Sequence, residues 1–114
     1  MKKAAVYAID FDGTIVTHEY PNIGKPIKDA FRVLKQLKRD GNKLILWTCR
    51  DGKELHEAVE FCKSMGLEFD AVNTNIPGIG IDPKPKIYAD LYIDDRGYGT
   101  VIDWNSIELD LASK

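Results

Sequence analysis

The chain has 114 residues, of which 44% are hydrophobic and 30% charged, and its formal net charge is −2. This length and balance fit one globular domain over residues 1–114 and exclude a strongly basic protein that binds nucleic acid as a scaffold. No run is long and apolar enough for a signal peptide or a membrane span, so we expect a cytoplasmic protein with no membrane partner. Cys49 and Cys62 form no Cys-x-x-Cys motif, and we expect both thiols to be reduced.

Strands and helices are expected to alternate along the chain. Apolar runs predict strands, and apolar residues that recur on one face predict helices. The predicted strands are residues 4–10, 43–47, 69–72 and 90–93, with a strand-like pair at 101–102. The predicted helices are residues 26–40, 52–65 and 106 onward, with a helical turn at 86–89. Pro26 is placed early in the first helix, and Asp51 with Glu54 is close to a capping box at the start of the second.

This order of elements is typical of a parallel sheet with helices packed on it. The first strand is apolar almost throughout, as a central strand buried on both faces would be. Residues 73–85 read as a loop because prolines, glycines and asparagines are frequent there. The sequence therefore predicts a three-layer, Rossmann-like α/β fold without repeats or linkers.

Two aspartates, Asp10 and Asp12, stand directly after the first strand in the motif Asp-Phe-Asp-Gly-Thr. With one residue between them, both side chains lie on the same face of an extended chain. Two carboxylates held this close repel each other unless a cation or a shared proton lies between them. An acidic turn that merely closes a strand is the alternative interpretation, but a costly charge pair at the end of a buried strand indicates a site.

Polar side chains also follow the other predicted strands. The segment 48–50, Thr-Cys-Arg, follows the second strand, and Asp94 with Asp95 follows the last. In parallel α/β sheets, ligands bind beyond the carboxyl ends of the strands. The coincidence of three such strand ends is stronger evidence for a site than any one motif.

The order of these motifs resembles the haloacid dehalogenase superfamily, whose usual members are Mg²⁺-dependent phosphohydrolases. The resemblance covers nearly the whole chain, and its first motif is highly specific. It implies that Asp10 is the nucleophile that forms an aspartyl-phosphate, and that Asp12 is the general acid and base. It also implies that Asp94 and Asp95 complete a Mg²⁺ site with the Asp10 carboxylate and the Asp12 backbone carbonyl. We favour Asp95 as the direct ligand, with Asp94 binding directly or through water.

The remaining motifs of the resemblance concern substrate binding. Thr48 is expected to donate a hydrogen bond to a phosphoryl oxygen, although a threonine in a strand is often simply a good β-former. Arg50 gives a Thr-x-Arg sequence similar to that of polynucleotide kinase-phosphatases, in which a guanidinium could bind phosphate in bidentate fashion. An exposed arginine near the start of the second helix is the competing interpretation.

A lysine is also expected to balance the charge between the nucleophile and the phosphoryl group. Lys84 and Lys86 are the two candidates, and we favour Lys86 because the run Lys-Ile-Tyr-Ala-Asp fits small members of the superfamily. We expect Lys86 to act in both catalysis and substrate binding.

No segment of the chain is long enough to fold as a cap domain, so the chain resembles a capless member of the superfamily. An uncapped site suits a large phosphorylated substrate, or a homo-oligomer in which a neighbour covers the site. The segment 17–23 is the candidate for contacts beyond the phosphate. The alternatives to a phosphatase are a phosphotransferase of the same superfamily and a catalytically inactive phosphate-binding or interaction module.

Overall fold

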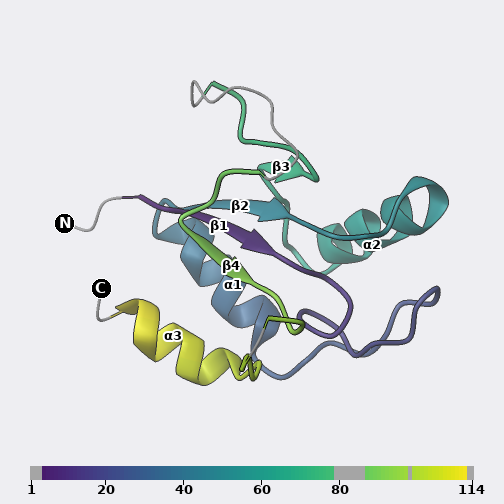
Figure 1. Cartoon of the computed structure of the whole chain (residues 1–114), viewed down its shortest axis with the longest axis horizontal. Coiled ribbons are helices and arrows are strands. Elements are labelled where there is room, and N and C mark those ends of the chain that lie inside the picture. Colours follow the sequence, from purple (N-terminus) through teal and green to yellow (C-terminus); the bar gives the residue numbers. More distant parts are fainter. Residues whose placement is uncertain (1–3, 79–86, 98, 113–114) are drawn as a thin grey trace.

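The computed structural model describes residues 4–78, 87–97 and 99–112. The elements are arranged around one small sheet (Figure 1). In chain order they are β1 (Val6–Ile9), α1 (Ala30–Arg39), β2 (Lys43–Leu46), α2 (Gly52–Ser64), β3 (Ala71–Val72), β4 (Leu91–Ile93) and α3 (Trp104–Ala112). All strand pairs are parallel, and the sheet order is β3-β2-β1-β4. The predicted α/β fold, a parallel sheet flanked by helices, is confirmed.

The two faces of the sheet are covered differently. Tyr7 and Ile9 of β1 point into the main core, which also holds apolar side chains of all three helices. Ala8 points to the opposite face and packs with Ile76 and Ile87, which belong to the connection between β3 and β4. Within the described residues, the third layer of the expected three-layer fold is therefore an irregular segment and not a helix.

Helix α1 begins later than the sequence predicts. Pro26 lies in an antiparallel bridge with Val16, and the Ile27 N–H donates to the carbonyl of Ile15. These bonds hold the chain in a hairpin-like excursion after β1, so the helix starts only at Ala30. The expectation that the helix begins at Pro26 is wrong, because the backbone groups of residues 26 and 27 pair with residues 15 and 16 and are not available for the first helical turn.

Helix α2 follows its prediction closely, with one difference at its start. Asp51 is the N-cap residue, but its side chain makes no capping hydrogen bond, so the capping box does not form. The Cys62 side chain is a free thiol buried in the main core. Burial raises the pKa of the Cys62 thiol to about 12, which keeps it protonated and apolar.

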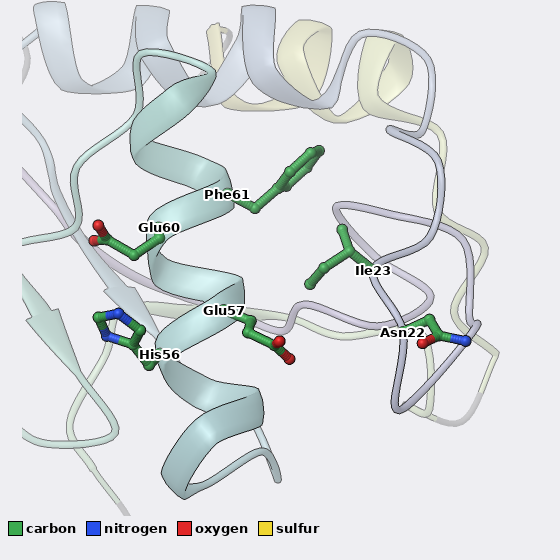
Figure 2. Close-up of a pocket in the computed structure, with 6 residues that line it drawn as sticks. All are labelled: Asn22, Ile23, His56, Glu57, Glu60 and Phe61. Carbon is green, nitrogen blue, oxygen red and sulfur yellow. The ribbon is translucent and has the colours of Figure 1, made fainter.

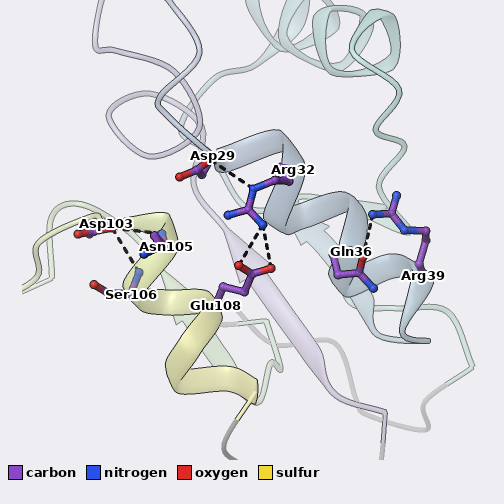
Figure 3. Close-up of polar contacts among 8 residues, drawn as sticks. All are labelled: Asp29, Arg32, Gln36, Arg39, Asp103, Asn105, Ser106 and Glu108. Carbon is purple, nitrogen blue, oxygen red and sulfur yellow. Dashed lines mark hydrogen bonds and ion pairs between the residues drawn. The ribbon is translucent and has the colours of Figure 1, made fainter.

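Helix α3 begins two residues earlier than predicted because Asp103 caps it. Asp103 Oδ1 accepts hydrogen bonds from the backbone N–H groups of Asn105 and Ser106, as Figure 3 shows. Farther along, Glu108 accepts two hydrogen bonds of 3.0 Å from Arg32 of α1.

Each helix of the described chain is too short or too polar to cross a membrane.

The end of the chain departs from prediction in three places. Residues 101–102 form no strand, and the Val101 side chain is 83% exposed. Residues 87–89 are not helical. In β4, Leu91 and Tyr92 are exposed while Ile93 is buried, because β4 is an edge strand and not the fully buried strand that its apolar sequence predicts.

Candidate functional site

Three carboxylates meet at the carboxyl ends of two neighbouring strands. Asp10 follows β1, and Asp94 and Asp95 follow β4, which pairs with β1. The Asp10 N–H donates to the carbonyl of Ile93, so pairing continues up to the acidic residues. One carboxylate oxygen from each aspartate lies within 4.8 Å of the others. The structure thus brings together three of the four predicted metal-binding residues through their side chains.

Charge and burial make this cluster costly without a positive partner. Burial first, and then the charge of Asp94 and contact with Asp95, raise the pKa of Asp10 from 3.8 to about 7. The Oδ1 atom of Asp95 is buried and has no hydrogen-bond partner among the described residues. An unpartnered buried carboxylate oxygen is costly, and a cation or a proton would satisfy it. The donor set, oxygens only, suits a hard cation such as Mg²⁺.

The raised pKa of Asp10 gives a testable pH dependence of stability in the metal-free protein. Between pH 3.8 and about 7 the folded protein binds a proton at Asp10 that the unfolded chain has lost. Protonation of Asp10 therefore stabilises the folded protein fully below pH 3.8, and this stabilisation is lost as the pH rises through about 7. We expect the denaturation midpoint of wild type, relative to that of Asp10→Asn, to fall across this range. A difference between the two proteins that does not change with pH would contradict the expectation.

A turn of backbone holds the two acidic strand ends against each other. Gly13 adopts φ +82°, and a Cβ at this position would lie 2.3 Å from Oδ2 of Asp95. The buried Thr14 hydroxyl accepts a hydrogen bond of 3.1 Å from the Asp95 N–H. The Thr14 carbonyl in turn accepts one of 2.8 Å from the buried indole of Trp104. Thr14 therefore links the segment around Asp10 and Asp12 to the segment at Asp95 through a hydrogen bond.

Asp12 lies beside this cluster and is held by Arg50. The Nε and Nη2 atoms of Arg50 each donate a 2.8 Å hydrogen bond to a different oxygen of the Asp12 carboxylate. The Arg50 side chain is 1% exposed and that of Asp12 12%. The remaining N–H groups of the guanidinium donate to the backbone carbonyls of Pro21, Asn22 and Glu54. The alternative of an exposed surface arginine is therefore wrong.

Thr48, another predicted substrate-binding residue, lies two residues beyond the end of β2. The Thr48 N–H donates to Oδ1 of Asn73 at 2.8 Å, and the Thr48 hydroxyl accepts from the Arg50 N–H at 3.2 Å. Asn73 follows β3 and adopts φ 52°, a conformation that asparagine tolerates better than most residues. Lys84 and Lys86, the candidate lysines, lie outside the described residues.

One pocket of the described residues is separate from the acidic cluster, because none of the three clustered aspartates lines it. It has a volume of about 510 Å³ and runs between α2 and the segment at residues 22–23. Figure 2 shows that Glu57 and Phe61 point from α2 toward Ile23, whereas His56 and Glu60 lie on the other flank of the helix. Because its ionisable groups do not converge, we place the site at the strand ends and not in this pocket.

Sequence reasoning missed three supporting residues: Thr14 as a link to Asp95, Asn73 and Trp104. Trp104 is buried, and the hydrogen bond of its indole to the Thr14 carbonyl had no signal in the sequence. Asn73 had a weak signal, since asparagine directly after a strand favours a turn with positive φ.

Comparison with known proteins gives one solved structure of high similarity. It is described as the structure of a conserved protein coded by a locus from Bacteroides thetaiotaomicron. The two chains are 44% identical and superpose with a TM-score of 0.91, over 97% of this chain and 92% of that one. No protein-family model and no curated protein matches the sequence. The chain belongs to the same protein family as this conserved protein from Bacteroides thetaiotaomicron.

Proposed function

We propose that the protein is a Mg²⁺-dependent phosphohydrolase that cleaves phosphate monoesters through an aspartyl-phosphate on Asp10. The observation that carries this proposal is the set of three carboxylates within 4.8 Å at adjacent strand ends. The buried, unpartnered Oδ1 of Asp95 supports a cation at this position. The resemblance of the motifs to the haloacid dehalogenase superfamily supports Asp10 as the nucleophile.

Asp10, Asp94 and Asp95 would hold the ion through their side chains, and Asp12 through its backbone carbonyl. These are all oxygen donors, and the cluster contains no histidine or cysteine, which a Zn²⁺ site would favour. Bound Mg²⁺ would neutralise the carboxylates and the phosphoryl charge.

The chain's own residues divide the chemistry between them. An Asp10 oxygen attacks the phosphorus, the bond from phosphorus to the ester oxygen breaks, and Asp12 gives that oxygen its proton. A water molecule then attacks the phosphorus of the aspartyl-phosphate and loses its proton to Asp12. The bond from Asp10 to phosphorus breaks, which releases inorganic phosphate and restores both aspartates. Thr48 at the neighbouring strand end would donate to a phosphoryl oxygen.

Phosphate release from an aryl and an alkyl phosphate, measured with added Mg²⁺ and with a chelator, tests the proposal. Because uncatalysed hydrolysis of phosphate monoesters is extremely slow, even a modest enzyme stands far above background. We expect turnover that requires Mg²⁺. Absence of turnover over a broad panel of phosphate esters would contradict the proposal, and phosphate found on an added acceptor would identify a phosphotransferase instead.

A further inference from the structure

The buried guanidinium of Arg50 joins three parts of the chain. It binds the Asp12 carboxylate after β1, the carbonyls of Pro21 and Asn22 in the excursion that follows, and the Glu54 carbonyl in the first turn of α2. A buried charge is tolerated only when its counter-ion and hydrogen-bond partners are in place. Arg50 meets this condition fully, since each of its five N–H groups has an acceptor.

A guanidinium with all its donors occupied has no N–H left for a phosphoryl oxygen. To bind phosphate, Arg50 would have to give up bonds to Asp12 or to backbone carbonyls that would remain without a donor. We infer that Arg50 is a positioning residue that fixes the Asp12 carboxylate for proton transfer and does not itself bind the phosphoryl group. This inference rests on the proposed function and replaces the expectation that Arg50 binds substrate.

Aromatic rings keep the guanidinium in position. Its central carbon lies 5.0 Å from the ring centre of Phe11 and 5.1 Å from that of Tyr20. Phe11 is fully buried, whereas Tyr20 is 51% exposed and belongs to the excursion after β1. Cation–π contacts of this length are attractive. The excursion, the arginine and Asp12 therefore form one packed unit, so the position of the carboxylate depends on the order of the segment at residues 20–22.

The planar fork explains why arginine stands at this position. Two parallel hydrogen bonds fix both the distance and the plane of a carboxylate, which a lysine ammonium cannot do. In this arrangement both Asp12 oxygens act as acceptors, which is the form that takes a proton from the attacking water. The proton that Asp12 takes from this water is the one that the same carboxyl gives to the leaving group of the next substrate molecule.

The test is Arg50→Lys, with Arg32→Lys as the matched control. Arg32 also makes two hydrogen bonds to one carboxylate, that of Glu108, but its side chain is 49% exposed, and its acidic partners are Glu108 and Asp29, which are not part of the cluster. We expect Arg50→Lys to lower kcat by about 10²-fold with KM changed less than about twofold, because it loses a positioned acid and base but no substrate contact. The kcat loss should be larger for an alkyl than for an aryl phosphate, because the alkoxide needs the proton more. Arg32→Lys should match wild type.

The outcomes separate this inference from the proposed function. A rise in KM with kcat unchanged, or equal losses for the two esters, would identify Arg50 as a phosphate ligand and overturn the inference while the function stands. Wild-type values of kcat and KM in Arg50→Lys would also overturn the inference, because they would show that Asp12 does not need Arg50 for proton transfer, and they would leave the proposed function standing. An inactive wild type would overturn the function and the inference together. If Arg50→Lys does not fold, Tyr20→Ala replaces it, and a smaller kcat loss with the same preference for the aryl ester is expected.

Discussion

Asp10→Asn is expected to reduce Mg²⁺-dependent phosphate release to about 10⁻³ of the wild-type rate or less. An amide cannot form the aspartyl-phosphate, and loss of a covalent nucleophile typically costs three or more orders of magnitude. The variant should be at least as stable as the metal-free wild type above pH 7, because it removes one of the carboxylates that repel each other in the cluster. Turnover and thermal denaturation measured on the same samples check both parts.

Asp40→Asn is the matched control for this prediction. Asp40 follows α1 at the opposite end of the helix from the site, and its side chain accepts a hydrogen bond from Gln36. The same change of acid to amide should leave phosphate release unchanged there. Substantial Mg²⁺-dependent turnover in Asp10→Asn would show that Asp10 is not the nucleophile.

Gly13→Ala is expected to destabilise the protein strongly and to remove its response to Mg²⁺. Position 13 has φ +82°, where a side chain costs about 1–2 kcal/mol. The new methyl group would also lie 2.3 Å from Asp95 Oδ2, and overpacking of this kind costs about 1–3 kcal/mol. Because the Asp95 carboxylate must move away, the carboxylates no longer converge. Chemical denaturation with and without Mg²⁺ measures both effects.

Gly41→Ala separates backbone strain from the clash. Gly41 has φ +94°, but a Cβ there would meet no atom within 4 Å. We expect this variant to lose only the backbone part of the stability and to be stabilised by Mg²⁺ to the extent that we expect for wild type. Equal losses in the two variants, with equal Mg²⁺ responses, would show that the contact between Gly13 and Asp95 does not shape the site.

The sequence was sufficient to predict the elements of the fold, because their apolar patterns are local. Each of the seven helices and strands among the described residues is found where a pattern predicts it, with ends that shift by a few residues. The errors arise where nonlocal contacts decide. Pro26 pairs with Val16 in a bridge, and residues 101–102 have a strand-like composition but pair with no strand of the described residues.

Convergence of the acidic residues was also predictable, because parallel strands end at one edge of the sheet. The strand ends predict that Asp10, Asp94 and Asp95 lie close together, and they do. The environment of Arg50 was not predictable. Its partners include the backbone carbonyls of residues 21, 22 and 54. Every residue has a backbone carbonyl, so the amino-acid sequence does not indicate which of them will lie near the guanidinium.

Identification of the residue that carries phosphate during turnover tests the central proposal most directly. The protein is mixed with an alkyl phosphate and Mg²⁺, quenched in acid during turnover, and reduced with borohydride, which converts an aspartyl-phosphate to homoserine. Peptide mass spectrometry then locates the product. We predict homoserine at position 10 and unmodified aspartate at positions 12, 94 and 95. Turnover accompanied by phosphate on any other residue, or by none on Asp10 under conditions that trap the intermediate, would contradict the mechanism.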